Sequence, residues 1–589
     1  MHLDPIFAEL LRNNELPSEA EFREATQLRS QANDDVLQID AEIRRLQAKR
    51  EQVQSSIDIY NIISSPARRL LPDILQEIFY HCTSQPYPIL SATEAPMLLT
   101  RVCSLWRSVA LSSPRIWTRL HIPLPGDPRM SPNYGSYGMK DDRAVEVRRQ
   151  IFSKMMQLRC RAVKDWLGRS GSLPLSLSIS YPFECEPSTN GDSTEDDEVV
   201  DPLFLTIQPF ASRWRHLDLS VPFHIYRKLE TKIPLDNLSM LRYFKGTIFL
   251  HSYTPPQPAL IPLHIIELPA LEALSISCIQ LTMNLYLYPN SWDRLTDICF
   301  ETPVSDTDLL EILKQCHKLI TLDANIQIPW IRPEGLEPTF KMVLLPHLEV
   351  LKLRESGSTS AIISAINAPF VKLLQYWCPH RYDSSSSDLE APSLLIPESL
   401  IWLISNAAAS LKTLSIDPST FRPEHVLQCL RLAVHVKELK FGDKLFFPSP
   451  DLEDDIVSRP DVFDLQAFTV HASEYDSSTP GGTPFQNDIL LPNLESLEAN
   501  GGYVVADEIL RTILLSRIDS AQRGLTSHLR RVRVRFARKK REDIEPEITA
   551  RARDAGIGMK LDLVYQPPGL NIGPLSPSFL VPDLYDLHS

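Results

Sequence analysis

The sequence has few glycines, no paired cysteines and no long apolar run. Only 19 of its 589 residues are glycine, against 48 prolines, so many rigid and irregular connections are expected. The nine cysteines are scattered without a CxxC pair, which is typical of reduced intracellular thiols. No stretch of about 18 apolar residues occurs, and the first residues do not resemble a signal peptide. These absences favour a cytoplasmic or nuclear protein without a membrane span.

Motifs of catalysis are missing as well. The chain contains no phosphate-binding glycine loop, no HExxH, no GxSxG and no histidine–cysteine cluster at metal-ligand spacing. We therefore expect neither an enzyme nor a bound metal or cofactor. The net charge of −14 gives no overall attraction to nucleic acid or to an acidic membrane, and it favours protein partners.

Residues 21–64, after a flexible segment 1–20, are predicted to form one long helix. Apolar residues recur there at steps of three and four, which is the heptad spacing of a coiled coil. Arg50 interrupts this seam. The helix either pairs with a second chain or folds back onto its own chain, and the sequence leaves both possibilities open. The seam residues are Val36, Ile39, Ile43, Leu46, Val53, Ile57 and Tyr60.

Residues 122–205 are expected to connect this region to a larger domain. An amphipathic helix is predicted over 141–170, with Ile151, Met155, Leu158 and Trp166 along its buried face. The alternating segment 173–181 predicts the first strand, and the acidic residues 184–201 predict a solvated surface loop.

From residue 206 to 566 a short pattern, apolar-x-x-apolar-x-apolar, returns at intervals near those of leucine-rich repeats. Each copy predicts one strand whose core a neighbouring copy must complete, so a solenoid of parallel strands and outer helices is expected. An ordinary α/β domain is the alternative. Asn325 and Asn500 come close to the asparagine of regular repeats, and 567–589 is expected to be a tail. The copies begin at Trp214, Leu271, Leu295, Leu319, Leu348, Val371, Leu411, Val436, Leu465, Leu494 and Leu529.

Residues 66–121 predict two further amphipathic helices. Pro72 suits the first turn of the first helix, whose apolar residues then follow at helical spacing. Two such helices bury little by themselves. They form either a small hairpin that packs on the repeats or a docking face for the helices of another protein.

The segments LPDILQEIF, VCSLWRSVA and PRIW in this region resemble the F-box, in the form found in large fungal families with leucine-rich repeats. The resemblance covers about a tenth of the chain, and its inter-helix loop is longer than a compact F-box has. It implies docking to a Skp-type adaptor and, through it, to a cullin. The matching residues are Leu71, Pro72, Ile74, Leu75, Ile78, Phe79, Val102, Cys103, Trp106, Arg107 and Trp117.

The resemblance implies the substrate receptor of an SCF ubiquitin ligase, in which the repeats capture an unknown protein substrate. A non-ligase scaffold built on the coiled helix and the repeats is the alternative. Candidate substrate contacts are basic residues on outward positions of two repeats, because guanidinium groups pair with carboxylate and phosphate. Alternatively the last three of them protect a solvated edge strand, or ARKKR is a nuclear-localisation signal. These residues are Lys352, Arg354, Arg531, Arg533 and Arg535.

Overall fold

The protein is an α/β protein with a long amino-terminal helix and a large sheet of parallel strands. Its contacts divide the chain into two units, Met1–Cys82 with Leu99–Ala110, and Thr83–Leu98 with Leu111–Ser589. The computed structural model describes residues 10–11, 16–83, 87–124, 142–181, 200–249, 263–279, 291–327, 341–356, 361–377, 398–418, 421–442, 463–470, 489–503, 505–536 and 540–565.

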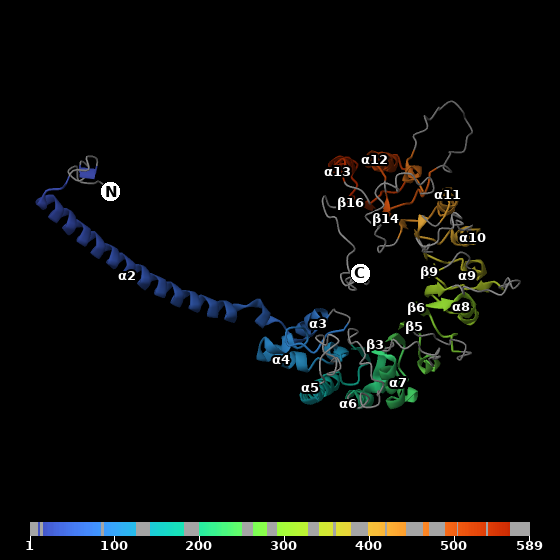
Figure 1. Ribbon diagram of the computed structural model, residues 1–589, viewed down its shortest axis with the longest axis horizontal. Helices are drawn as coiled ribbons and strands as arrows, with labels where there is room; N and C mark the ends of the chain where they lie inside the picture. Colours follow the sequence, from blue (N-terminus) through green and yellow to red (C-terminus); the bar gives the residue numbers. More distant parts are fainter. Residues whose placement is uncertain are drawn as a thin grey trace, which may run out of the picture. The chain divides into compact units, whose positions relative to one another are not determined.

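The first unit begins with α2 (Glu19–Ser64), which confirms the predicted long helix. A capping box explains its start: the Ser18 hydroxyl accepts from the Glu21 backbone N–H, and the Glu21 carboxylate accepts from the Ser18 N–H at 2.7 Å. None of the side chains of α2 is buried. The helix is drawn in blue in Figure 1.

A short turn η1 (Pro66–Arg69) leads to α3 (Pro72–Cys82), and η2 (Leu98–Arg101) leads to α4 (Ser104–Leu111). Leu75 and Phe79 of α3 are fully buried, and so is Ala110 of α4. The rings of Phe79 and Trp106 pack with their centroids 5.0 Å apart. These contacts give the first unit a small apolar core.

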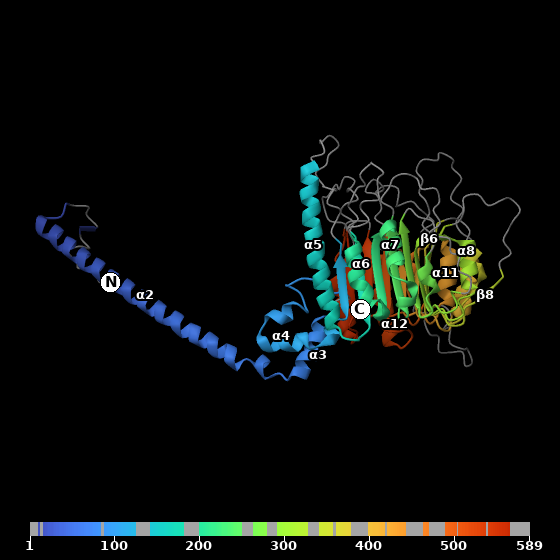
Figure 2. The ribbon, with the colours of Figure 1, turned by 90° about the horizontal axis from the view of Figure 1, so that it is seen from below.

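The second unit is built on a 14-stranded parallel sheet, counted over the described residues. Its strands follow one another almost in chain order, as a solenoid-like arrangement requires, and Figure 2 shows them side by side. They are β1 (Arg119–Pro123), β2 (Leu175–Ser180), β3 (Trp214–Pro222), β4 (Tyr243–Phe249), β5 (Ala273–Ile279), β6 (Asp297–Ser305), β7 (Thr321–Gln327), β9 (Val350–Ser356), β11 (Leu373–Trp377), β12 (Thr413–Ile416), β13 (Glu438–Phe441), β14 (Ser496–Tyr503), β15 (Arg531–Phe536) and β16 (Lys560–Val564). A separate pair joins β8 (Val343–Leu344) to β10 (Ile366–Asn367).

Helices between the strands cover one face of this sheet (Figure 1). The inner residues of each motif, such as Leu351 and Leu353, are completely buried, whereas the residues between them stay on the other face, named here the open face. The helices are α5 (Asp142–Arg169), α6 (Asp201–Ile207), α7 (Phe223–Lys232), α8 (Asp306–Leu313), α9 (Ala361–Ala365), α10 (Glu398–Ala407), α11 (Pro423–Leu432), α12 (Asp507–Gln522) and α13 (Glu545–Asp554). Short 3₁₀ turns supplement them: η3 (Pro114–Trp117), η5 (Gln208–Arg213), η6 (Leu235–Leu238), η7 (His264–Glu267) and η12 (Leu465–Phe468).

The sheet differs from the predicted one at four places. All but one of the predicted motif strands form, but the copy at Leu465 is the turn η12, because the Asp464 carboxylate accepts from the Gln466 N–H and starts a 3₁₀ turn. The sheet also contains β1, β4 and β16, which the repeated motif did not predict. In β4 the third motif position is Gly246, and a Cβ there would lie 2.9 Å from the Phe244 ring.

The predicted buried face of α5 is wrong in part. Ile151, Met155 and Leu158 are about half exposed, and of the predicted set only Trp166 is buried. The helix carries a second apolar stripe, offset by about one residue, and this second stripe is the one that packs. Its members are Phe152, Met156, Val163, Trp166 and Leu167.

Three predicted segments fall wholly or largely outside the described residues. They are most of the amino-terminal segment 1–20, the acidic loop 184–201 up to residue 199, and the tail 567–589.

Candidate protein-interaction surfaces

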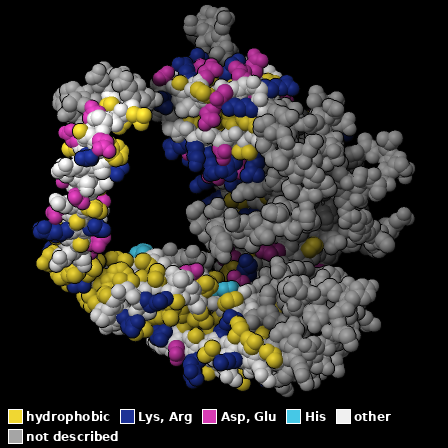
Figure 3. All heavy atoms as spheres, turned by 60° about the vertical axis from the view of Figure 1, so that its left-hand side comes forward, with side chains coloured by type: hydrophobic (Ala, Val, Ile, Leu, Met, Phe, Trp, Pro, Cys, Tyr) yellow, Lys and Arg dark blue, Asp and Glu magenta, His cyan; other side chains and the backbone are white. Residues whose placement is uncertain are grey.

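The helices α3 and α4 and the residues just before them expose a set of large apolar side chains, named here the apolar face. Its members are Leu71, Ile74, Ile78, Val102 and Leu105, and they are 67%, 50%, 38%, 55% and 40% exposed. Figure 3 shows hydrophobic side chains gathered on the surface beyond the end of α2, where α3 and α4 lie. Exposed apolar residues are common singly, but a cluster on two helices marks a site for contact with another molecule.

The remaining residues of the F-box resemblance divide into surface and core. Pro72, Cys103 and Arg107 are exposed beside the apolar face, whereas Leu75 and Phe79 are buried beneath it. The guanidinium of Arg107 donates to the Thr100 carbonyl at 2.8 Å, which fixes the turn before α4. The structure therefore brings these predicted residues together in one unit.

Trp117 differs from the other predicted residues, because it is a core residue of the second unit. It is completely buried, its ring meets Trp166 edge-on at 4.8 Å, and the Arg169 guanidinium lies 4.7 Å from its centroid. A residue with no exposed surface contacts no partner directly. Trp117 supports the start of the sheet instead.

Lys352 and Arg354 lie on the open face of β9, where both pair with one carboxylate of the neighbouring strand. Their amino and guanidinium groups lie 3.6 and 3.0 Å from the two carboxylate oxygens of Asp323 on β7. The register explains this, since Asp323 stands opposite Lys352. Both residues are thus engaged within the sheet.

The three arginines of β15 lie on the same open face, and they are not on an edge strand. β15 pairs with β14 on one side and β16 on the other, so the edge-strand explanation is wrong. Arg533 lies 2.7 Å from Asp562 and 3.6 Å from Glu498, and the hydrogen bond to Asp562 raises its pKa. Arg531 is exposed and has no ion pair in the part of the chain that the structure describes.

The two predicted basic groups are not one site. Five strand spacings separate β9 from β15, which is about 24 Å at the usual spacing of about 4.8 Å. The group on β15 includes Arg531, which has no ion pair among the described residues, and Figure 3 shows Lys and Arg side chains gathered at the level of the last strands.

A polar cluster at the start of the sheet was not anticipated from the sequence. The two ring nitrogens of His121 on β1 lie 3.0 Å from the Ser178 hydroxyl and 3.2 Å from the Ser180 hydroxyl of β2. Burial lowers the pKa of His121, and burial together with Arg215 lowers that of His216 on β3. Because serine hydroxyls occupy both ring nitrogens, with no described carboxylate bonded to either, His121 lacks the geometry of a catalytic triad.

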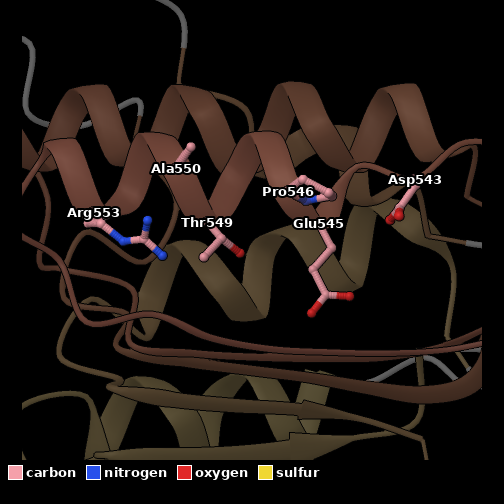
Figure 4. A pocket seen from close by; sticks show the side chains of 6 residues that line it. All are labelled: Asp543, Glu545, Pro546, Thr549, Ala550 and Arg553. Atoms are coloured by element: carbon pink, nitrogen blue, oxygen red, sulfur yellow. The ribbon is translucent and has the colours of Figure 1, made fainter. Parts of the chain in front are cut away.

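Within the described ranges no three histidine, cysteine or acidic side chains lie close enough to hold a metal ion. A hollow of about 480 Å³ lies over α13, where Figure 4 shows Glu545, Thr549 and Arg553 along one side of the helix. It is open and its side chains are mostly exposed, so it has none of the enclosure of a small-molecule site. No helix among the described residues is both long enough and apolar enough to cross a bilayer.

No protein-family model and no curated protein sequence matches this chain.

Proposed function

We propose that the chain is the substrate receptor of an SCF-type cullin-RING ubiquitin ligase. In this proposal its F-box docks a Skp-type adaptor, and its leucine-rich repeats capture a protein substrate. The chain itself performs no chemistry, and it contributes proximity and orientation to the ligase.

The observation that carries the proposal is the apolar face. The F-box resemblance implies eleven adaptor-binding residues. Of these, Leu71, Ile74, Ile78 and Val102 are large apolar side chains left exposed, whereas Leu75, Phe79 and Trp117 are buried and cannot contact a partner directly. Exposing the first four to water is unfavourable unless a partner covers them, since burial of apolar area is the main driving force of protein association. The buried Leu75 and Phe79 hold the helices that present them.

The open face supports the second half of the proposal. A parallel sheet with helices on one side leaves a long row of polar side chains accessible on the other, as solenoid proteins use for binding. The alternative is a scaffold outside any ligase. The length and exposure of α2 favour this alternative, because a helix without buried residues suits assembly.

The test is direct binding of the purified full chain to a purified Skp-type adaptor, followed by addition of the cullin. We expect a stoichiometric complex by light scattering, and we expect Ile78→Asp to abolish it. Ile320→Asp is the matched control, since Ile320 is 40% exposed against 38% for Ile78 and lies outside the apolar face. Absence of adaptor binding by the wild-type chain would refute the receptor function and leave the scaffold.

A further inference from the structure

The helix α2 has the length and exposure of one strand of a coiled coil. Its 46 residues extend over about 69 Å at the helical rise of about 1.5 Å per residue. The seven apolar seam residues from Val36 to Tyr60 are between 43% and 67% exposed. None of them is buried, so the seam is uncovered within the first unit.

We propose that α2 pairs with the α2 of a second copy in an antiparallel coiled coil. The apolar seam runs over nearly four heptads, a length that indicates a coiled coil. The direction of pairing is decided by the charged residues in and beside the seam, because in a coiled coil these residues set partner orientation.

A parallel, in-register pair is opposed by like charges. Arg29 and Arg50 occupy core positions of the heptad, so each would face its own copy across the interface. Asp35 and Asp40 occupy the flanking positions that meet in a parallel pair. Such a pair therefore places arginine against arginine twice and aspartate against aspartate at both edges.

In an antiparallel pair centred between Arg44 and Arg45, opposite charges meet instead of like charges. This pair sets Arg50 beside Asp40 of the second copy, and Glu42 beside Lys49 of the second copy, each twice by symmetry. Lys49, Arg50 and Asp40 make no ion pair within the described part of a single chain, so all three are available. Arg29 then lies level with Tyr60 of the second copy, at a position suited to a cation–π contact.

The charges also select the register. Moving the antiparallel helices by one heptad places Glu42 opposite Glu42 of the second copy in one direction. The same movement in the other direction places Lys49 opposite Lys49. Of these three registers, only the one centred between Arg44 and Arg45 has no like-charged pair on the two-fold axis, and it sets Glu42 beside Lys49 of the second copy.

The first experiment is sedimentation of the full chain over a range of concentrations, together with zero-length carbodiimide cross-linking of an equal mixture of unlabelled and isotope-labelled chain. We expect a reversible dimer and an intermolecular cross-link between Lys49 and Glu42. In a single helix these residues are seven apart, too far for a zero-length link. A monomer at every concentration, or cross-links of parallel pairing, would overturn the proposal.

Two variants distinguish the antiparallel pair from a parallel one. Asp40→Arg places like charges beside Arg50 and is expected to weaken the dimer at least tenfold, whereas in a parallel pair it would relieve the contact with Asp35 and strengthen it. Adding Arg50→Asp to the first change should restore the dimer. Both residues are exposed on a helix without buried side chains, so neither change is expected to unfold the protein. A double variant as weak as the single one contradicts the pairing of Arg50 with Asp40.

Discussion

Truncation of the apolar face should weaken adaptor binding by an amount that follows from its exposure. Leu71 and Ile74 are 67% and 50% exposed, so a partner can cover at most the equivalent of slightly more than one whole side chain. Full burial of a leucine or isoleucine contributes about 1.5–3 kcal/mol. The double change Leu71→Ala, Ile74→Ala is therefore expected to cost about 2–3 kcal/mol, which corresponds to roughly 30- to 150-fold in Kd.

The assay is titration calorimetry with a purified Skp-type adaptor, and the stability of each variant is measured beside it. Because both side chains are exposed, we expect the free energy of unfolding to change by less than about 0.5 kcal/mol. The matched control is Ile320→Ala, Leu344→Ala, whose residues are 40% and 56% exposed but belong to the second unit. A Kd that changes by less than threefold in a folded double variant would refute the assignment of this face to the adaptor.

Three further predictions concern the second unit. Arg517 is 3% exposed and donates to the carbonyls of Phe468, Leu490 and Leu491, so Arg517→Met should lower the unfolding free energy in urea by about 3 kcal/mol or more. The control is Arg511→Met on the same helix, where the Arg511 side chain is 28% exposed and pairs with exposed carboxylates, so it should cost under about 1 kcal/mol. Because the pKa values of His121 and His216 are lowered from 6.5, the unfolded chain binds more protons, and stability should be lost as the pH falls below about 6.5. The variant His121→Gln, His216→Gln should lose less stability between pH 7 and pH 5 in thermal unfolding, and an unchanged slope would exclude these residues as its cause. Arg531→Ser should leave folding and adaptor binding intact but release acidic or phosphorylated substrates, and an unaltered set of captured substrates would exclude this residue from recognition.

Most strands were predictable because the motif encodes a strand directly. Three apolar residues at fixed spacing give two inward positions and leave the outward positions polar, and nearly every copy forms a strand of the parallel sheet. The prediction failed where the sequence departs from the motif or favours a competing turn. Gly246 removes one apolar position from β4, and at Leu465 the Asp464 carboxylate favours a 3₁₀ turn although the apolar pattern is present.

The buried face of α5 could not be predicted for a different reason. The helix has two apolar stripes of similar strength, one containing Ile151 and Met155 and the other containing Phe152 and Met156. Periodicity identifies each stripe as amphipathic, but the choice between them depends on which side meets the rest of the second unit. Tertiary packing decides which stripe is buried, and the sequence of the helix alone does not specify it.

The sequence alone does not show which basic side chains of the open face are free to bind a partner. A lysine or arginine between the leucines of a motif is correctly predicted to point outward, yet its charge is available only if the adjacent strands leave it unpaired. Asp323 lies 29 residues before Lys352, and Glu498 lies 35 residues before Arg533, and only the register of the sheet brings each pair together. The carboxylate of Asp323 pairs with both cations of β9 and offsets one of their two charges, so that strand is a weaker anion-binding candidate. The arginines of β15 outnumber the acidic partners within reach, and Arg531 at the start of that strand keeps an unpaired charge among the described residues. A substrate drawn by negative charge should therefore bind at the carboxyl-terminal end of the open face, beside β15.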